Sequence, residues 1–152
     1  MTPIAALAAI LSLLLLAALA GALLRRRSPR VVTPGPDARV DLDDFAEFGD
    51  LAAPGTPTSG GRGTVVQFST DYCARCPGVR RTLSALVEDR RALQFVHVDV
   101  THRPDLAKKY GLLQTPTVLL IDAIGTPRAR LSGPLSRTVL SDALDTLTGG
   151  TP

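Results

Sequence analysis

The 152-residue chain has only two cysteines, Cys73 and Cys76, and two residues separate them. They occur in the segment FSTDYCARCPGVRR, in which Arg75 stands between the cysteines and a proline follows the second. Thiols at this spacing can exchange between a dithiol and a disulfide, can supply two ligands to a metal ion, or can form a structural bond. Each kind of chemistry requires different elements around the two cysteines.

Strand and helix patterns alternate around the cysteines. We expect strands at 64–68, 93–100, 116–122 and 128–133, and helices at 77–91, 103–111 and 136–147. The crossover helices early in this order imply parallel strands, whereas the short turn before 128–133 implies an antiparallel hairpin. The predicted fold class is therefore α/β, with a central mixed sheet flanked by helices.

These elements place the two cysteines differently. Cys73 falls in the turn after the first of the expected strands, and Cys76 opens the helix that follows. A helix N-terminus presents unpaired N–H groups and the positive end of the helix dipole, and both stabilise a thiolate, the nucleophilic form of cysteine. Arg75 adds a permanent positive charge beside them. A Cys-x-x-Cys pair on such a turn within a βαβ unit is typical of a redox-active dithiol.

A zinc site and a structural disulfide are the alternatives to redox chemistry. Zinc needs four ligands, and the further candidates of the usual kind are His97 and His102, which gives the pattern C-x2-C-x20-H-x4-H. That interval contains a helix and most of a strand, unlike a zinc finger, and His97 alternates with valines as a residue on the less buried face of a strand does. A disulfide that closes so short a loop contributes little stability. We therefore predict neither a metal site nor a purely structural disulfide.

Residues 64–147 resemble a thioredoxin. The segment VVQFSTDYCARC matches the family's strand followed by a Cys-x-x-Cys, and KKYGLLQTPTVLLID matches its second motif, in which a Tyr-Gly precedes a Thr-Pro that opens a strand. Gly125 and Gly133 fall where the family has glycines in and after the final hairpin. The resemblance implies a thioredoxin-like fold and a thiol–disulfide oxidoreductase, most simply one that reduces protein disulfides.

The resemblance also assigns roles to individual residues. It implies that Cys73 attacks a substrate disulfide and that Cys76 resolves the mixed disulfide that forms. Pro116 would be preceded by a cis peptide bond, and the backbone of Thr115 would pair with an extended client segment. Tyr72, Ala74 and Arg75 would contact the substrate, although Tyr72 could instead simply pack. The implied partners are disulfide-containing clients and a recycling reductase or oxidant, with no metal or organic cofactor.

The chain departs from the family around the dithiol. The family's usual Trp-Cys-Gly-Pro-Cys is replaced by a segment with Tyr72 and Arg75, and Gln67 stands where the family commonly has a buried acid. The lysine that often partners this acid aligns near Phe95, so we expect proton transfer to run through water. Arg75 should favour the reduced thiolate and make the disulfide more oxidising. These departures leave an alternative, a non-catalytic binding module or redox sensor for a membrane partner.

The N-terminal part of the chain is apolar. Residues 2–24 include no charged side chain, and a helix over them would span about 30 Å, the thickness of a bilayer core. We predict a single-pass transmembrane anchor at 1–24. A cleaved signal peptide is the alternative, since 18–20 read Ala-Leu-Ala, but no basic residue precedes the run and the run is long for a signal. A buried core helix fits poorly because a single polar residue, Ser12, interrupts the run.

Arginines at 25, 26, 27 and 30 follow this segment directly. The positive-inside rule therefore predicts a cell-membrane protein with its N-terminus outside and its domain in the cytoplasm, the extracytoplasmic orientation being the alternative. A cytoplasmic domain would favour net reduction. These arginines also account for much of the net charge of +3, and no aromatic residues interleave with the other basic pairs, so we predict no nucleic-acid partner.

The predicted organisation has three parts. The anchor is followed at 25–63 by a basic juxtamembrane segment, an acidic stretch and a Gly/Pro-rich linker, and the thioredoxin-like domain occupies 64–152. Within 40–51, Leu42, Phe45, Phe48 and Leu51 recur at a spacing that suits a short docked helix, which could be the remnant of the family's first βα unit. A solvated tether is the alternative reading of this stretch.

Overall fold

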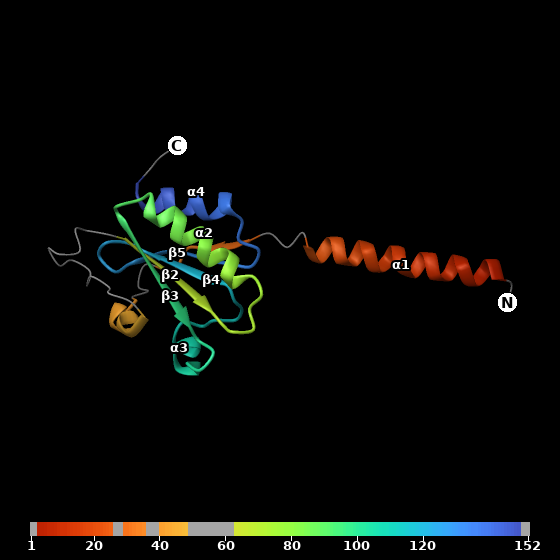
Figure 1. Ribbon diagram of the computed structural model, residues 1–152, viewed down its shortest axis with the longest axis horizontal. Coiled ribbons are helices and arrows are strands. Elements are labelled where there is room, and N and C mark those ends of the chain that lie inside the picture. Colours follow the sequence, from red (N-terminus) through yellow and green to blue (C-terminus); the bar gives the residue numbers. More distant parts are fainter. Residues whose placement is uncertain (1–2, 26–28, 36–39, 49–62, 150–152) are drawn as a thin grey trace.

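The computed structural model describes residues 3–25, 29–35, 40–48 and 63–149, and Figure 1 shows their arrangement. The elements are α1 (Pro3–Arg25), β1 (Arg30–Val32), the 3-10 helix η1 (Leu42–Phe48), β2 (Gly63–Ser69), α2 (Cys76–Glu88), β3 (Leu93–Asp99), α3 (Pro104–Lys109), β4 (Thr117–Ile121), β5 (Pro127–Ser132) and α4 (Arg137–Leu147). Every strand and helix predicted after residue 63 is present, with ends shifted by a few residues.

One mixed sheet organises the domain, in the strand order β1-β5-β4-β2-β3. β2 and β3 are parallel, whereas β4 runs antiparallel to both β2 and β5. This confirms the predicted combination of an early crossover and a late hairpin. β1 was not predicted: it has three residues and pairs antiparallel with β5, with Val31 opposite Leu131.

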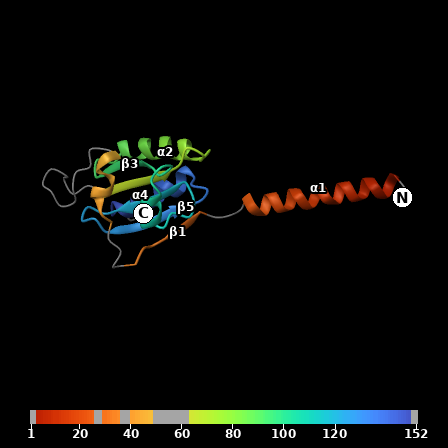
Figure 2. The same ribbon diagram turned by 90° about the horizontal axis from the view of Figure 1, so that it is seen from below.

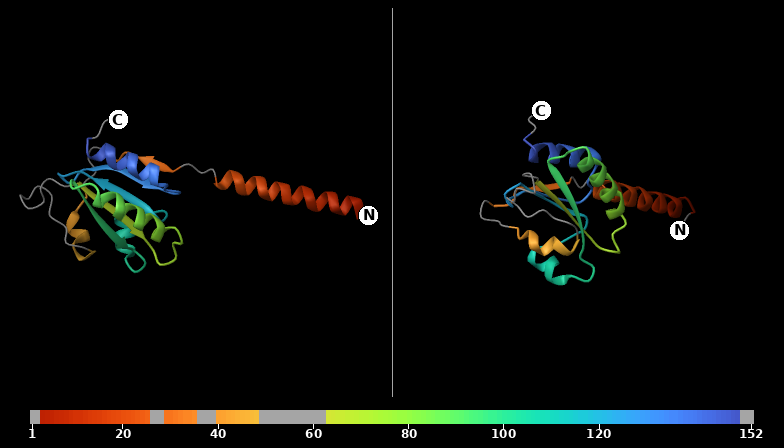
Figure 3. Two further views of the ribbon diagram at one scale, coloured as in Figure 1. Left: turned by 45° about the horizontal axis from the view of Figure 1, so that its top comes forward. Right: turned by 60° about the vertical axis from the view of Figure 1, so that its left-hand side comes forward.

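Each face of the sheet carries its own apolar core, and Figure 3 shows the helices that lie over the two faces. α2 and α4 cover one face, where Val65, Leu83 and Leu140 belong to one buried cluster. On the other face, Phe45 of η1 and Leu106 of α3 belong to a second cluster. α4 begins at the predicted N-cap, because the backbone N–H of Val139 donates to the Ser136 side chain. β2 lies between β3 and β4, buried on both faces, so the loop that follows it starts from a rigid point.

The acidic stretch docks through η1. Leu42 and Phe45 are buried, and the Phe45 ring lies 5.7 Å from the Phe68 ring and 5.2 Å from the Tyr110 ring, measured between centroids. Lys109 forms a salt bridge with Asp44 at 2.6 Å. Of the two sequence-based readings, the docked helix therefore holds for 42–48, although the turn is 3-10 rather than α. Leu51 and the predicted linker up to residue 62 lie outside the described residues.

α1 projects away from the domain in Figures 1 and 2. Its side chains are described at Leu7 and at 9–21, and the large apolar ones are exposed, for example Leu15 at 74%. Over the residues that the structure describes, no helix meets the combined length and apolarity that crossing a membrane requires. This finding does not show the transmembrane anchor at 1–24, which stays a prediction.

Candidate active site

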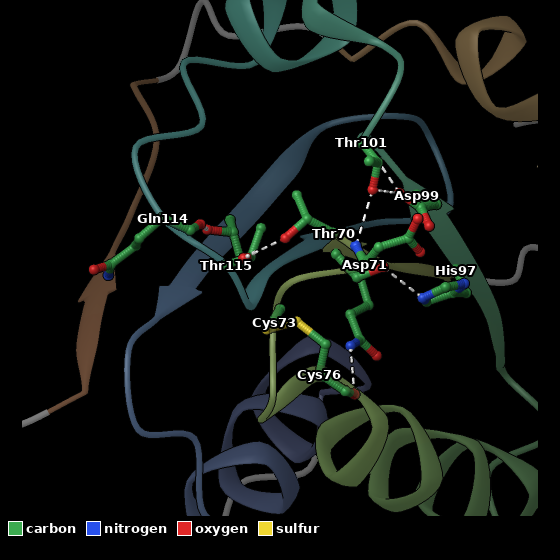
Figure 4. Close-up of a disulfide and its surroundings, with 12 residues drawn as sticks. Thr70, Asp71, Cys73, Cys76, His97, Asp99, Thr101, Gln114 and Thr115 are labelled. Carbon is green, nitrogen blue, oxygen red and sulfur yellow. Dashed lines mark hydrogen bonds between the residues drawn. A yellow bond between two sulfur atoms is a disulfide. The ribbon is translucent and has the colours of Figure 1, made fainter.

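Cys73 and Cys76 form a disulfide, with an S–S distance of 2.05 Å and a Cα–Cα distance of 5.4 Å. The bond lies where β2 passes into α2, between the sheet and the start of the helix (Figure 4). Cys73 is in the loop and Cys76 is the first residue of α2, as the sequence predicted.

Two short turns bring the cysteines together. The backbone N–H of Cys73 donates to the carbonyl of Thr70 at 3.0 Å, and the N–H of Cys76 donates to the carbonyl of Cys73 at 3.1 Å. Pro77 stands in the first turn of α2, where a missing N–H leaves no helical hydrogen bond unmade. Cys73 is half-buried whereas Cys76 is only 3% exposed, so Cys73 is the cysteine that a large substrate can reach.

The start of α2, beside the disulfide, is positively charged. The N-terminal turn of α2 has no acidic residue, although the helix dipole favours negative charge there. Arg75 occupies the N-cap position with an exposed side chain, and Arg80 and Arg81 are exposed in the next turn. This field and the free N–H groups of the helix start stabilise an anion such as a thiolate.

The Thr115–Pro116 peptide bond is cis, as the resemblance implied. Its loop lies beside the dithiol loop, because the Oγ1 atoms of Thr70 and Thr115 are 3.3 Å apart (Figure 4). Arg130 holds the start of the same loop by donating to the carbonyls of Tyr110 and Gly111 at 2.7 and 2.9 Å. The structure thus brings Thr115 next to the dithiol loop, although Thr70 and Thr115 are 45 positions apart in sequence.

The other predicted substrate contacts lie at the surface. Tyr72 is 90% exposed, which rules out a packing role for its side chain. Ala74 and Arg75 are exposed too, and they line one side of a groove of ≈480 Å³ whose other side includes Gly133 and Pro134. These residues are therefore placed where a bound segment could touch them.

Gln67 lies fully buried beneath the dithiol. Its Nε2 donates to the carbonyl oxygen of Cys76 at 3.0 Å. Its Oε1 is also buried and accepts no hydrogen bond from the described residues. An amide has no ionisable proton in the ordinary pH range, so Gln67 can hold the start of α2 but cannot relay a proton as an acid could.

The register of the sheet corrects the expectation that the partner position of residue 67 lies near Phe95. Gln67 pairs with His97 on β3, whereas Phe95 pairs with Val65 in the apolar cluster. Paired residues of parallel strands lie on the same face, so the β3 neighbour of Gln67 is His97, two residues beyond Phe95. The alternation of His97 with valines marks it as a strand residue on the less buried face, but it does not fix the register against Gln67.

His97 also contacts Ser69, which lies two residues after Gln67 on β2. The His97 Nε2 and the Ser69 Oγ lie 2.7 Å apart, and Ser69 is buried. Burial lowers the pKa of His97 below its ordinary value, the charge of Arg80 lowers it further, and Asp99 acts in the opposite direction. The imidazole is therefore neutral at neutral pH.

A further set of hydrogen bonds fastens the dithiol loop to the end of β3. The backbone N–H of Asp71 donates to the Oγ1 of Thr101 at 2.9 Å, and Thr101 donates from its own backbone N–H to Asp99 at 2.8 Å. The hydrogen bonds from Thr101 lower the pKa of Asp99. These contacts hold the start of the loop that carries Cys73, and the hydrogen bond from Gln67 to Cys76 holds its end.

Metal ligands do not assemble in the part of the chain that the structure describes: no group of three or more His, Cys, Asp or Glu side chains there could hold a metal ion. His97 contacts Ser69, and His102 is exposed in the loop before α3. The two histidines of the zinc alternative are therefore not gathered around the cysteines.

Comparison with known proteins gives a consistent result. The family model described as Thioredoxin matches residues 59–146. Thioredoxin H2 of Arabidopsis thaliana is 32% identical over 57 residues, which is 38% of this chain and 43% of that protein. Thioredoxin-2, mitochondrial, of Schizosaccharomyces pombe is 33% identical over 73 residues, which is 48% of this chain and 53% of that protein. The chain thus spans about half the length of these relatives.

Solved structures agree in fold. A mutant thioredoxin from Halobacterium salinarum matches with a TM-score of 0.56 at 23% identity, over 80% of this chain and 100% of that one. At this identity the likeness concerns the arrangement of strands and helices alone.

Proposed function

The chain belongs to the thioredoxin family, and on that basis we propose that it is a thiol–disulfide oxidoreductase that reduces disulfides of client proteins. The observation that carries the proposal is the bond between Cys73, which is accessible, and Cys76, which is buried at the start of α2. The Cys73 sulfur is accessible to a substrate, and the Cys76 sulfur lies within bonding distance of it.

The reaction consumes the reduced dithiol. The Cys73 thiolate attacks one sulfur of the client disulfide, which forms a mixed disulfide and releases the client's other sulfur as a thiolate. The Cys76 thiol then loses its proton and attacks the sulfur of Cys73, which releases the second client thiolate. Two electrons pass to the client, and a reductase must return the dithiol to its reduced state.

The loops around the disulfide support roles in holding the client. The backbone of Thr115 lies beside the dithiol loop and would pair with an extended client segment, in the manner of an added strand. Tyr72, Ala74 and Arg75 offer exposed surface next to Cys73 in the same loop. Because Gln67 cannot accept the proton of Cys76, that proton passes to water.

The experiment that tests this function traps the intermediate. With a disulfide-bonded protein as substrate, Cys76→Ser should accumulate a mixed disulfide that reductant cleaves, because Cys73 can attack but nothing resolves the product. Cys73→Ser should form none. If neither variant is trapped, and if a client stays bound when both cysteines are serine, the chain is a binding module and not an oxidoreductase.

We also propose that residues 1–24 anchor the chain in a membrane, with the domain in the cytoplasm. The support is the absence of charged residues from 2–24, the exposure of the described leucines of α1, and the arginines that follow. The chain should resist extraction from membranes at alkaline pH. An impermeant maleimide should label the reduced cysteines only after cells are permeabilised, and labelling of intact cells would contradict the orientation.

A further inference from the structure

We propose that the groove beside the disulfide binds an acidic segment of the client protein, through Arg75 and Arg81. The inference rests on the proposed function for its role in turnover, because it names the class of client. The binding itself needs no redox step, and the two can therefore be tested apart.

The groove has the position and size of a peptide site. It measures ≈480 Å³ and lies between the start of α2, with Ala74, Arg75 and Arg81, and the loop from β5 to α4, with Gly133 and Pro134. Ala74 and Arg75 are the two residues between the cysteines. A segment that follows the client's disulfide into this groove would meet both guanidinium groups.

The arginines around the groove are not used by the fold. No salt bridge within the described ranges involves Arg75 or Arg81, whereas four other basic side chains are paired. The paired ones are Arg90, Arg103, Lys109 and Arg128. Cations at a helix N-terminus also oppose the helix dipole. Two arginines without a salt bridge at this helix start cost stability, which a functional use of their charge would explain.

The nearest acidic groups do not neutralise the groove. Figure 4 places Asp71 and Asp99 near His97, on the side of the disulfide away from Gln114 and Thr115. Gly133 of the groove belongs to the opposite side, since a Cβ at this position would lie 3.9 Å from the Gln114 Nε2. Asp99 is moreover engaged by Thr101. The positive charge of the groove is therefore free to act on a ligand.

Carboxylates are the chemistry that this surface fits. A guanidinium presents paired N–H donors that match a carboxylate, and exposed charge of one sign steers an oppositely charged partner and repels a like one. Tyr72, which precedes Cys73 in the same loop, is 90% exposed and offers apolar contact beside the dithiol. The expected client segment is thus acidic with apolar residues among its carboxylates.

The test measures binding and turnover with the full chain in a non-ionic detergent. Short cysteine-free peptides of equal length and apolar content, one rich in Asp and Glu and one rich in Lys, are titrated against the oxidised protein. The acidic peptide should bind at least about tenfold more tightly, and the preference should vanish in about 1 M salt, where charges are screened within about 3 Å. Reduction of disulfide peptides with the same flanks should show the same ratio.

Charge reversal identifies the site. Arg75→Glu with Arg81→Glu should abolish or invert the ratio of acidic to basic peptide. Arg91→Glu is the matched control, because Arg91 is also exposed but lies beyond the other end of α2, and it should leave the ratio as in the wild type. A ratio near one in the wild type, or one that Arg91→Glu changes as much as the double variant does, overturns the proposal.

Failure of the proposed function has a different signature. Hydroxyethyl disulfide is small and uncharged, so its reduction reports the dithiol chemistry without the groove. If the wild type does not reduce it but still prefers the acidic peptide, the oxidoreductase is refuted and the acidic groove stands. If it is reduced while the peptides bind equally, the groove proposal alone is refuted.

Discussion

The side-chain amide of Gln67 donates a 3.0 Å hydrogen bond to the backbone carbonyl of Cys76. Through this bond β2 holds the first residue of α2, and with it the buried sulfur of the disulfide. The bond comes from a neutral group that is fully buried, at a position where the family commonly has an acid. The start of α2 is therefore held in place by a buried side chain that does not titrate.

Replacing Gln67 with the isosteric acid should make stability depend on pH. A buried carboxyl has a raised pKa, because burial disfavours its charge and the Cys76 carbonyl requires a donor. The unfolded state ionises above about pH 4 while the folded state stays protonated, so Gln67→Glu should lose up to about 1.4 kcal/mol of stability per pH unit above this value. Urea unfolding at about pH 5 and pH 8, compared with the wild type, measures this. An equal difference at both pH values would refute a buried, protonated carboxyl.

The same variant should also resolve mixed disulfides faster. Above its raised pKa, the ionised carboxylate beside Cys76 can accept the proton that Gln67 cannot, and general acid–base catalysis is worth about a hundredfold or more when a group is well placed. We expect an increase of about tenfold in the rate at which a preformed mixed disulfide at Cys73 releases its client. Gln67→Leu is the control, since it removes the amide without adding an acid. An acceleration in both variants would mean that the amide hinders the step.

His97 should make the protein less stable in acid. Its pKa is lowered by burial and then by Arg80, against the effect of Asp99, so the folded state binds the proton less readily than the unfolded state. Stability should therefore fall as pH drops through about 6.5, the ordinary pKa of histidine. His97→Gln should flatten this part of the curve, while His102→Gln, at an exposed position, should keep it. A curve that His97→Gln leaves unchanged would contradict the assignment.

Docking of η1 should depend on one ring. Phe45 is fully buried against Phe68 and Tyr110, so Phe45→Ala should cost about 3–5 kcal/mol of unfolding free energy. Phe48, which is only half-buried, is the matched control and should cost clearly less when changed to alanine. Equal losses in denaturant unfolding would show that η1 does not pack as a specific element.

Much of this arrangement could be predicted from the sequence. The Cys-x-x-Cys pair, the Thr-Pro motif and the alternating strand and helix patterns are local signals, and they place Cys73, Cys76 and Pro116 correctly. β1 escaped prediction because three residues carry no periodicity, and it becomes a strand only through its pairing with β5.

The rest depended on contacts between distant segments. Whether 40–51 docks is decided by the fit of Phe45 between Phe68 and Tyr110, which spacing alone cannot reveal. The neighbour of Gln67 depends on the register of β2 and β3, and an error of two residues in that register separates Phe95 from His97.

The central claim is that Cys73 and Cys76 form a reversible redox pair, and a redox titration of the full chain tests it most directly. The chain is equilibrated in graded glutathione buffers, its free thiols are alkylated, and the mass is read. We predict one two-electron transition in which both cysteines change together, at a potential above the value of about −270 mV for thioredoxin because Arg75 favours the thiolate. Arg75→Ala should lower this potential by about 10–20 mV. Two thiols that react independently, or that never form an intramolecular disulfide, would contradict the account.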